Sequence, residues 1–336
     1  MTLSIGVIGV GMIGQDHVRR LTTVLAGANV VAISDANASV AKEVAGRVAG
    51  SKVYATGEEL IAAKGVDAVV VTSWGPTHAT YVLAAIKAGK PVFCEKPLAE
   101  TEADCSAILD AEAALGRRLV QVGFMRRFDG QYRAMKETIA SGAIGAPLIF
   151  QSGHRNPSVP GYYTKNNALT DTAVHDIDIA RFLLDDEPAA ISVKTPRRNS
   201  RGGDLADPLF TLMEMRGGAL VTIETSVNIA YAYDIRGEII GEMGVVTLAE
   251  RNDVVVKSNG VFLGRVPADW RERFMTAFDT EFREWLAAAA KGGAAGPSAW
   301  DGYVATVVSG IGVKAIESRQ REPIKLRERP ALYAAA

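Results

Sequence analysis

Cysteine and histidine are scarce in this chain of 336 residues, which contains two cysteines and four histidines. Cys94 and Cys105 lie in apolar or helical stretches, so we expect two free thiols in a reducing cytoplasm. No HExxH pattern or comparable cluster of ligands occurs, and the sequence therefore predicts no metal site. A GxSxG turn and a Cys/His pair suited to a nucleophile are also missing, which argues against the common hydrolase mechanisms.

Long apolar runs and an excess of one charge are lacking as well. No stretch of about 20 apolar residues is present, so the sequence predicts no membrane span. The first residues carry no basic region ahead of residues 3–10, which is unlike a secretory signal. With 37 basic and 38 acidic side chains, the net charge is −1. This balance provides no attraction to nucleic acid or to an anionic membrane, and we expect a cytoplasmic protein with neither partner.

Apolar residues make up 48% of the chain, and its length favours two domains. In the first third, short Val- and Ile-rich runs alternate with helical stretches. The expected strands are residues 3–10, 29–34, 68–72, 91–94 and 118–122, and the expected helices are residues 15–25, 39–48, 58–63, 77–88 and 102–115. This alternation predicts an α/β domain of the Rossmann type, with a doubly wound parallel sheet covered on both faces.

The pattern changes after Gly123, and we place the domains at residues 1–123 and 124–336. The second part predicts an α+β domain with a large, mainly antiparallel open sheet and helices against one face. Expected hairpins join residues 209–215 to 219–226 and 254–257 to 261–263, and expected helices cover residues 128–141, 171–184, 274–286 and 301–318. Val221, Ile223 and Ile239 are candidate apolar positions for subunit contacts on the open face.

A GxGxxG motif begins at Gly9, directly after the first strand and at the start of a helix. Gly9 permits a tight turn, Gly11 lets the backbone approach a pyrophosphate, and Gly14 lets the helix pack close to the sheet. Met12 and Ile13 lie at the helix N-terminus, where free N–H groups favour phosphate. The motif in this context predicts a dinucleotide site.

The second strand is followed by Asp35, 21 residues after Gly14. A carboxylate here can accept hydrogen bonds from the ribose hydroxyls of the adenosine and would repel a 2′-phosphate. Ala36 and Asn37 provide no arginine for such a phosphate. The sequence therefore predicts NAD rather than NADP.

Two further groups of residues carry side chains suited to chemistry. Lys96 follows the strand at 91–94, at the edge of the sheet that faces the ligand crevice, where it could support a developing alkoxide; a surface cation is the alternative. Asp171, His175 and Asp178 share one face of a predicted helix, and histidine is suited to proton transfer near neutral pH. A solvated polar face is the alternative there. His17, in the first helix, is expected to be structural.

Together these motifs resemble the large oxidoreductase family named after glucose–fructose oxidoreductase and inositol dehydrogenase, the Gfo/Idh/MocA family. The resemblance covers essentially the whole chain, and within the family it is greatest to the inositol 2-dehydrogenases of bacteria. The more specific segments are residues 72–78, 92–98, 121–129, 154–157 and 297–303. The resemblance implies that the protein uses NAD to oxidise a ring hydroxyl of myo-inositol to the ketone.

The resemblance also implies roles for individual residues. Lys96, Asp171 and His175 would form the catalytic set, with His175 as general base, Asp171 orienting it and Lys96 holding the reacting oxygen. Other contacts to the polyol would come from Arg126, His154, Asn156, Asp178 and Tyr233, and contacts to the cofactor from Ser73, Trp74, His78, Glu95 and Lys96. A substrate with many hydroxyl groups needs such a set of polar side chains. The family further suggests a homotetramer built through the C-terminal sheets.

Three alternatives stay open from the sequence. The same fold and catalytic set would serve a dehydrogenase for scyllo- or chiro-inositol, an aldose or a sugar acid. Some relatives resemble glycosidases that use tightly held NAD for a transient oxidation. A regulatory protein that binds a nucleotide as a signal is the third alternative, and the presence of the lysine and the histidine argues against it.

Overall fold

The computed structural model describes residues 2–205, 207–249 and 255–334, which form two compact units. The first unit comprises Met1–Met125, Phe278–Thr306 and Arg327–Ala336, and the second comprises Arg126–Ala277 and Val307–Leu326. The N-terminal segment of the first unit ends two residues after Gly123, the boundary expected from the sequence. Two C-terminal segments that we had placed in the second domain also belong to the first unit. The change in strand pattern after Gly123 could not predict this, because it does not show that later helices pack against the core of the first unit.

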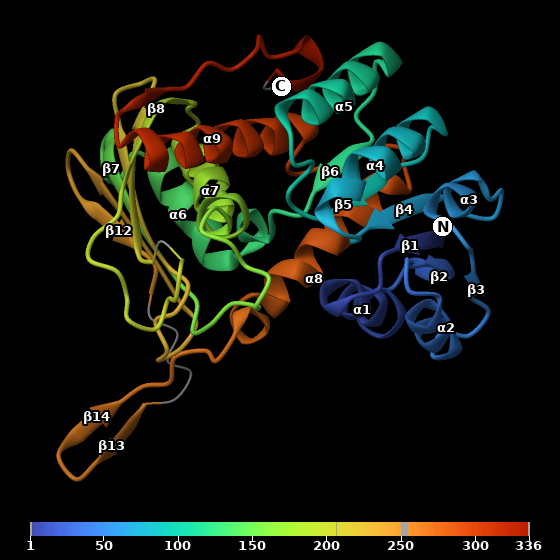
Figure 1. Ribbon diagram of the computed structural model, residues 1–336, viewed down its shortest axis with the longest axis horizontal. Coiled ribbons are helices and arrows are strands. Elements are labelled where there is room, and N and C mark those ends of the chain that lie inside the picture. Colours follow the sequence, from blue (N-terminus) through green and yellow to red (C-terminus); the bar gives the residue numbers. More distant parts are fainter. Residues whose placement is uncertain (1, 206, 250–254, 335–336) are drawn as a thin grey trace. The chain divides into compact units, whose positions relative to one another are not determined.

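The first unit is built on a six-stranded sheet in the order β3-β2-β1-β4-β5-β6, in which every neighbouring pair is parallel (Figure 1). Its strands are β1 (Leu3–Ile8), β2 (Ala28–Ser34), β3 (Lys52–Val53), β4 (Ala68–Val71), β5 (Val92–Cys94) and β6 (Val120–Val122). Its helices include α1 (Met12–Arg19), α2 (Ala38–Gly46), α3 (Gly57–Ala62), α4 (His78–Lys87) and α5 (Glu102–Leu115). This order confirms the Rossmann arrangement. Because β1 lies between β2 and β4, the strand order reverses there, and ligands bind beyond the carboxyl ends of such strands.

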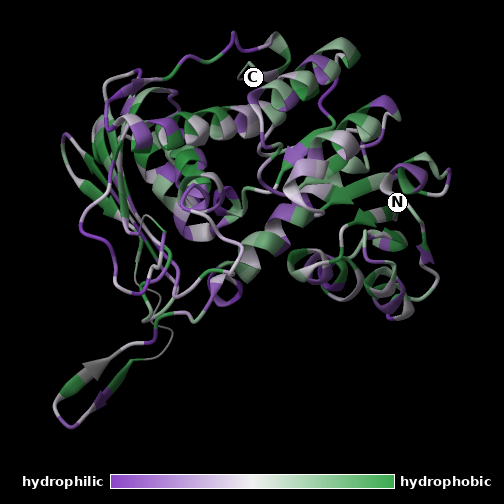
Figure 2. Cartoon of the chain, viewed as in Figure 1, coloured by the Kyte–Doolittle hydropathy of each residue, from purple (hydrophilic) through white to green (hydrophobic). Residues whose placement is uncertain are grey.

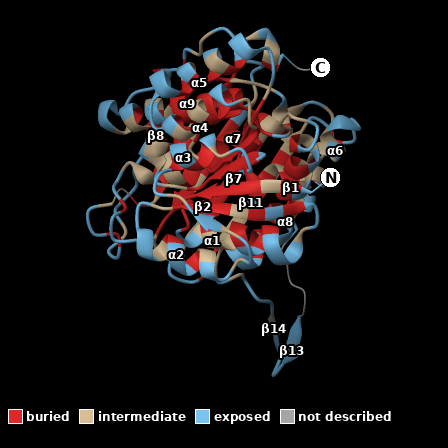
Figure 3. Ribbon diagram, turned by 90° about the vertical axis from the view of Figure 1, so that its right-hand side faces the viewer, coloured by how far each residue is buried: buried red, intermediate tan, exposed pale blue. Residues whose placement is uncertain are grey.

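The core of the first unit explains why a late segment of the chain belongs to it. All four residues of β4 are fully buried, and Figure 3 shows buried residues in β1 and β2 as well. Phe282, Trp285 and Leu286 of α8 (Trp270–Ala289) join the same apolar cluster as β1, β2 and α1. Their spacing of three and four residues places them on one face of the helix.

The second unit is built on a seven-stranded sheet in the order β12-β11-β7-β10-β9-β8-β15. Its strands are β7 (Pro147–Arg155), β8 (Pro188–Lys194), β9 (Leu209–Met215), β10 (Leu220–Ser226), β11 (Asp234–Gly241), β12 (Val245–Thr247) and β15 (Glu322–Pro323). β7 pairs in parallel with β10, and the other neighbouring pairs are antiparallel. The expected α+β domain with a mainly antiparallel sheet is therefore confirmed.

Helices cover one face of this sheet, and this corrects the expected subunit contacts. Val221, Ile223 and Ile239 are fully buried, and the strand register places both Val221 and Ile239 beside buried Phe150. Since side chains alternate across a strand, these residues point to the helix-covered face, and their assignment to the open face was wrong. The apolar residues of the opposite face are Ile149, Phe210, Leu212, Leu220, Ile240 and Val245.

The helices of the second unit include α6 (Gly130–Ala140), a π-helical segment η4 (Ala168–Ala173) and α7 (Val174–Leu184). α9 (Ala299–Ser318) matches the helix expected at 301–318. The helices contain both hydrophilic and hydrophobic residues, as the colours of Figure 2 show. Among the residues that the structure describes, no helix is both long and apolar enough to cross a membrane.

A two-stranded hairpin, β13 (Val256–Ser258) and β14 (Val261–Leu263), extends from the second unit (Figure 1). It turns at Asn259 and Gly260, whose φ angles are 51° and 73°, as expected for an Asn-Gly hairpin turn. The hairpin is confirmed, while Val254, which the prediction included, lies outside the described residues.

Candidate active site

The glycine turn between β1 and α1 has the close contacts that the motif predicts. Gly9 has a φ of +87°, and a Cβ there would lie 2.4 Å from the backbone of Ser73. A Cβ on Gly14 would lie 2.2 Å from the carbonyl oxygen of Gly9. A Cβ on Gly11 would meet no atom within 4 Å, and no side chain caps the N-terminus of α1. The turn is therefore tight on its inner side and open where a pyrophosphate would bind.

Asp35, directly after β2, is hydrogen-bonded to this turn. One carboxylate oxygen accepts the backbone N–H of Val10 at 2.7 Å, and the other accepts the N–H of Asn37 at 2.8 Å. Each oxygen keeps a further lone pair for a ribose hydroxyl, and the side chain is half-buried at the edge of the sheet. The residues of this edge fit NAD, although the sequence did not predict the bond from Asp35 to the glycine turn.

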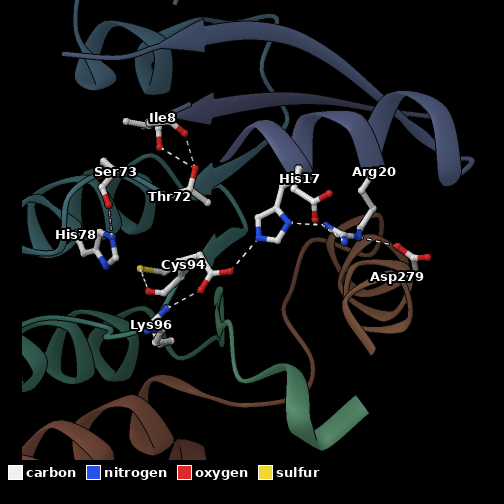
Figure 4. A network of polar contacts seen from close by, with 12 residues as sticks. Ile8, His17, Arg20, Thr72, Ser73, His78, Cys94, Lys96 and Asp279 are labelled. Carbon is white, nitrogen blue, oxygen red and sulfur yellow. Dashed lines mark hydrogen bonds and ion pairs between the residues drawn. The ribbon is translucent and has the colours of Figure 1, made fainter. Parts of the chain in front are cut away.

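The segment after β4 lies beside the glycine turn. Thr72 donates to the carbonyl oxygen of Gly9 at 2.5 Å, and Trp74 is 77% exposed. His78 is buried, with Nδ1 2.7 Å from the Pro97 carbonyl oxygen. Its Nε2 lies 2.9 Å from the Ser73 carbonyl oxygen (Figure 4). His78 thus holds two loops of the first unit together.

Lys96 follows β5 and is half-exposed. The preceding Glu95 is buried and accepts hydrogen bonds from the Lys96 backbone N–H at 3.1 Å and from His17 Nε2 at 2.8 Å. The carboxylate of Glu95 is therefore directed into the first unit. Lys96 belongs to the first unit, whereas Asp171 and His175 belong to the second.

In the second unit, Asp171 lies in the π-helical segment η4, and His175 lies in α7, which follows without a break. We had expected a single α-helix from residue 171 onward. Such π turns are frequent at functional sites, and four residues remain close to one helical turn. Asp171 is half-buried and His175 is 8% exposed. The His175 ring lies 6.2 Å from the His154 ring, centroid to centroid.

His154, near the end of β7, contacts a buried cluster of ion-paired side chains. Asp176 accepts hydrogen bonds from Arg126 at 2.6 Å and Ser152 at 2.5 Å, and its other oxygen lies 2.9 Å from His154 Nδ1. Burial alone would favour the neutral acid, but Arg126 and His154 hold the pKa of Asp176 below its ordinary value. Arg126 is 1% exposed, and its guanidinium group contacts Asp176 and His154 in this cluster. Asp176 was not among the site residues predicted from the sequence.

The remaining predicted polyol contacts also lie in the second unit. Asp178 is buried and pairs with Arg127 through two bonds of 2.6 and 2.9 Å. Tyr233 is buried with its ring perpendicular to that of His154 at 5.9 Å, and burial raises the pKa of its hydroxyl. Asn156 is half-buried, and its backbone N–H donates to Ser226 at 2.8 Å. The structure therefore brings His154, His175 and Tyr233 together.

In the described part of the chain, no group of three or more histidine, cysteine, aspartate or glutamate side chains is placed so that it could hold a metal ion. Cys94 and Cys105 are buried and free, and burial raises the pKa of both thiols.

Comparison with known proteins agrees with the fold. Residues 3–124 match the oxidoreductase family Gfo/Idh/MocA with its NAD-binding Rossmann fold, and residues 132–247 match the Gfo/Idh/MocA C-terminal domain. A protein of Saccharopolyspora erythraea named inositol 2-dehydrogenase 3 is 51% identical over 99% of this chain and 98% of its own length. An inositol 2-dehydrogenase of Azotobacter vinelandii is 49% identical over the full length of both chains.

A solved structure extends the similarity to three dimensions. The myo-inositol dehydrogenase of Lactobacillus casei, crystallised with NAD(H) and myo-inositol, superposes with a TM-score of 0.96 at 36% identity, covering 99% of this chain and all of its own. Together with the glycine turn, Asp35 and the two sheets, these matches establish the family. The chain belongs to the Gfo/Idh/MocA oxidoreductases, whose first domain is an NAD-binding Rossmann fold.

Proposed function

We propose that this protein oxidises one ring hydroxyl of myo-inositol to a ketone, 2-keto-myo-inositol, with NAD as the oxidant. The observation that carries the proposal is the open glycine turn with Asp35, in a chain that is 51% identical over nearly its full length to a protein named as an inositol 2-dehydrogenase. In the reaction the ring carbon loses a hydride and its hydroxyl loses a proton, so the products are the ketone, NADH and a proton.

The catalytic set consists of Lys96, Asp171 and His175. His175 accepts the hydroxyl proton as general base, and Asp171, about one helical turn earlier, orients the imidazole. Lys96 donates a hydrogen bond to the same oxygen and offsets its developing negative charge. Bound NAD supplies the hydride acceptor.

The polyol is held by polar side chains of the second unit, with His154, Asn156, Asp178 and Tyr233 in contact with its hydroxyl groups. The position of His154 beside His175 and Tyr233 supports this assignment. Arg126, which lies beside His154 and pairs with Asp176, completes this set of polyol contacts. Polar groups that would be left unpaired reject analogues that lack a hydroxyl.

The cofactor is held along the carboxyl edge of the first sheet. Gly9, Gly11, Met12, Ile13 and Gly14 form the pyrophosphate turn, and Asp35 binds the adenosine ribose, which favours NAD over NADP. Ser73 and Trp74 lie along the nicotinamide half. His78 and Glu95 support these cofactor contacts indirectly, since both side chains are buried and hydrogen-bonded within the first unit.

The chain assembles as a homotetramer through the open face of its second sheet, and it works in the cytoplasm. The apolar residues Phe210, Leu220 and Val245 on that face are 45%, 38% and 54% exposed, which favours burial against another copy. The two free cysteines suit a reducing compartment.

A panel of substrates tests the proposal. The purified protein is mixed with NAD and with myo-, scyllo- or chiro-inositol, glucose, or a sugar acid, and NADH is followed by absorbance. We expect turnover with myo-inositol. Turnover with another polyol alone would move the assignment to that substrate. Glycoside hydrolysis without NADH release would favour the glycosidase alternative, and NAD binding without any turnover would favour the regulatory one.

A further inference from the structure

A chain of buried and part-buried polar contacts runs through the first unit from α8 to the backbone of Lys96 (Figure 4). Arg20 Nε donates to Asp279 at 2.7 Å, and Arg20 Nη2 donates to Asp16 at 2.8 Å. Arg20 Nη1 lies 2.7 Å from Nδ1 of His17, and His17 Nε2 lies 2.8 Å from Glu95. These contacts join segments that lie far apart in the sequence.

The partners of His17 determine which of its nitrogens carries the proton. A guanidinium group only donates hydrogen bonds, so Nδ1 of His17 must be the acceptor for Arg20. Nε2 then carries the hydrogen and donates to the Glu95 carboxylate. Burial lowers the pKa of His17 below its ordinary value, and Arg20 acts in the same direction, whereas Glu95 and Asp16 oppose it. His17 is therefore a neutral link between a buried cation and a buried anion.

The far end of this chain is the loop that carries Lys96. One oxygen of Glu95 accepts the His17 proton, and the other accepts the backbone N–H of Lys96 at 3.1 Å. A Cβ on Gly123 would lie 3.0 Å from this second oxygen, which is an unusually tight contact, so the glycine gives the carboxylate room. The Glu95 carboxylate thus links the His17 ring to the backbone of Lys96.

The environment of His17 and Arg20 makes the arrangement rigid. Both side chains are 0% exposed, and the His17 ring packs against Phe282 at 4.4 Å and Phe93 at 5.7 Å between ring centroids. The Arg20 guanidinium lies 5.2 Å from the centre of the Phe278 ring. These ring contacts do not depend on the two imidazole nitrogens, so packing alone does not require a histidine.

We infer that His17 is a positioning residue for catalysis, which acts through Glu95 to hold the backbone of Lys96 in the place where its side chain supports the reacting oxygen. This inference rests on the proposed function, because it assigns His17 a role in the same reaction. Groups behind a catalytic residue often hold its geometry in this way. His17 itself touches neither substrate nor cofactor in this account.

Substitutions at position 17 separate positioning from packing. His17→Phe keeps an aromatic ring but removes both hydrogen bonds, and His17→Gln restores one acceptor and one donor. Leu21→Ala is the matched control, because Leu21 lies in the next helical turn, is fully buried and has no part in the contacts. For each variant, kcat and KM for myo-inositol, the Kd for NAD and the melting temperature are measured.

We expect His17→Phe to lower kcat at least tenfold while the Kd for NAD changes less than twofold. His17→Gln should recover kcat to within threefold of the wild type. Leu21→Ala should lower the melting temperature at least as much as His17→Phe does and keep kcat within twofold. An unchanged kcat in His17→Phe, or an equal loss of kcat in Leu21→Ala, would overturn the inference.

A double-mutant cycle with Lys96→Arg tests whether His17 acts through Lys96. The loss of kcat caused by His17→Phe should shrink below threefold in the Lys96→Arg background, and an equal loss in both backgrounds would contradict the inference. Should His17→Phe not fold, Glu95→Gln provides the same test with an unchanged side-chain volume, and we expect at least a tenfold loss of kcat. If the Lys96→Arg variant alone turns over normally, or the wild type does not oxidise myo-inositol, the proposed function fails instead.

Discussion

Oδ2 of Asp176 lies 2.9 Å from Nδ1 of His154, and both side chains are buried in the second unit. The carboxylate thereby favours one orientation of the imidazole, with the His154 Nδ1 edge turned toward the cluster. Asp176 also accepts a hydrogen bond from Ser152 and pairs with Arg126, a buried cation that lies 2.6 Å away. The charge of the Arg126 guanidinium is therefore balanced by this carboxylate.

Asp176→Asn should destabilise the protein by about 3–5 kcal/mol, because it leaves the Arg126 guanidinium buried without its counter-ion. Urea unfolding at pH 7 measures this loss. Asp185→Asn is the matched control, since it breaks an ion pair with Lys136 whose carboxylate is 80% exposed, and it should cost about 0–1 kcal/mol. Equal losses in the two variants would contradict the assigned importance of Asp176.

The same carboxylate predicts a dependence of stability on pH. The folded-state pKa of Asp176 is lowered, whereas an unfolded aspartate titrates at about 3.9. Its contribution is therefore full above the unfolded value and is lost as the pH falls below it. Between pH 5 and pH 3 the unfolding free energy of the wild type should fall more steeply than that of Asp176→Asn, as followed by urea titrations. Parallel curves would contradict the lowered pKa.

Substitution of two glycines in the turn should have different effects. Gly14→Ala places a Cβ 2.2 Å from the Gly9 carbonyl oxygen and should destabilise the fold by about 1–3 kcal/mol. Gly11→Ala meets no atom of the protein within 4 Å, so the melting temperature should stay unchanged. NAD affinity should nevertheless fall about tenfold or more, or about 1.4 kcal/mol, because the Cβ occupies the space of the pyrophosphate. Calorimetry measures both quantities, and unchanged binding by Gly11→Ala would move the phosphate site elsewhere.

Asp35→Ser should raise the KM for NAD by about tenfold to a hundredfold, since hydrogen bonds to a charged group contribute about 1.5–3 kcal/mol. The ratio of kcat/KM for NADP to that for NAD should rise as the repulsion of a 2′-phosphate disappears. Asp67→Ser is the control, because Asp67 also accepts a backbone N–H, from Ser4 at 2.8 Å, but at the opposite end of β1. A KM for NAD that rises equally in both variants would show a general loss of structure.

Local features of this chain were predictable from its sequence, and distant contacts were not. The glycine turn, Asp35 and the Asn259-Gly260 hairpin depend on residues within one or two elements, whose backbone needs are visible in the residue types. His17 and Glu95 lie 78 residues apart, and Arg126 and Asp176 lie 50 apart, so only the folded chain brings each pair together.

The faces of the second sheet show a further limit of sequence patterns. In β10, Val221 and Ile223 alternate with Leu220, so apolar residues occur on both faces. Their apolar character alone does not say which set meets the helices and which meets another subunit. The structure places Val221 and Ile223 under the helices, and the register with β7 and β9 defines the other set.

The corrected open face predicts where assembly can be disrupted. Leu212→Arg together with Phe210→Glu should convert the proposed homotetramer into smaller species, as light scattering would detect, because charges would be buried at the interface. Leu115→Glu is the control, since Leu115 is also a partly exposed apolar residue, at 43%, but lies on α5 in the first unit. A mass that stays tetrameric in the double variant would exclude this face as the interface.

Transfer of the hydrogen on the reacting carbon tests the central proposal most directly. The protein is mixed with NAD and with myo-inositol carrying deuterium at C2, and the nucleotide and the sugar products are examined by mass spectrometry. The proposed reaction predicts one deuterium in each NADH molecule and an equal amount of 2-keto-myo-inositol. NADH without deuterium would contradict oxidation at this carbon, and the absence of NADH would contradict the dehydrogenase itself.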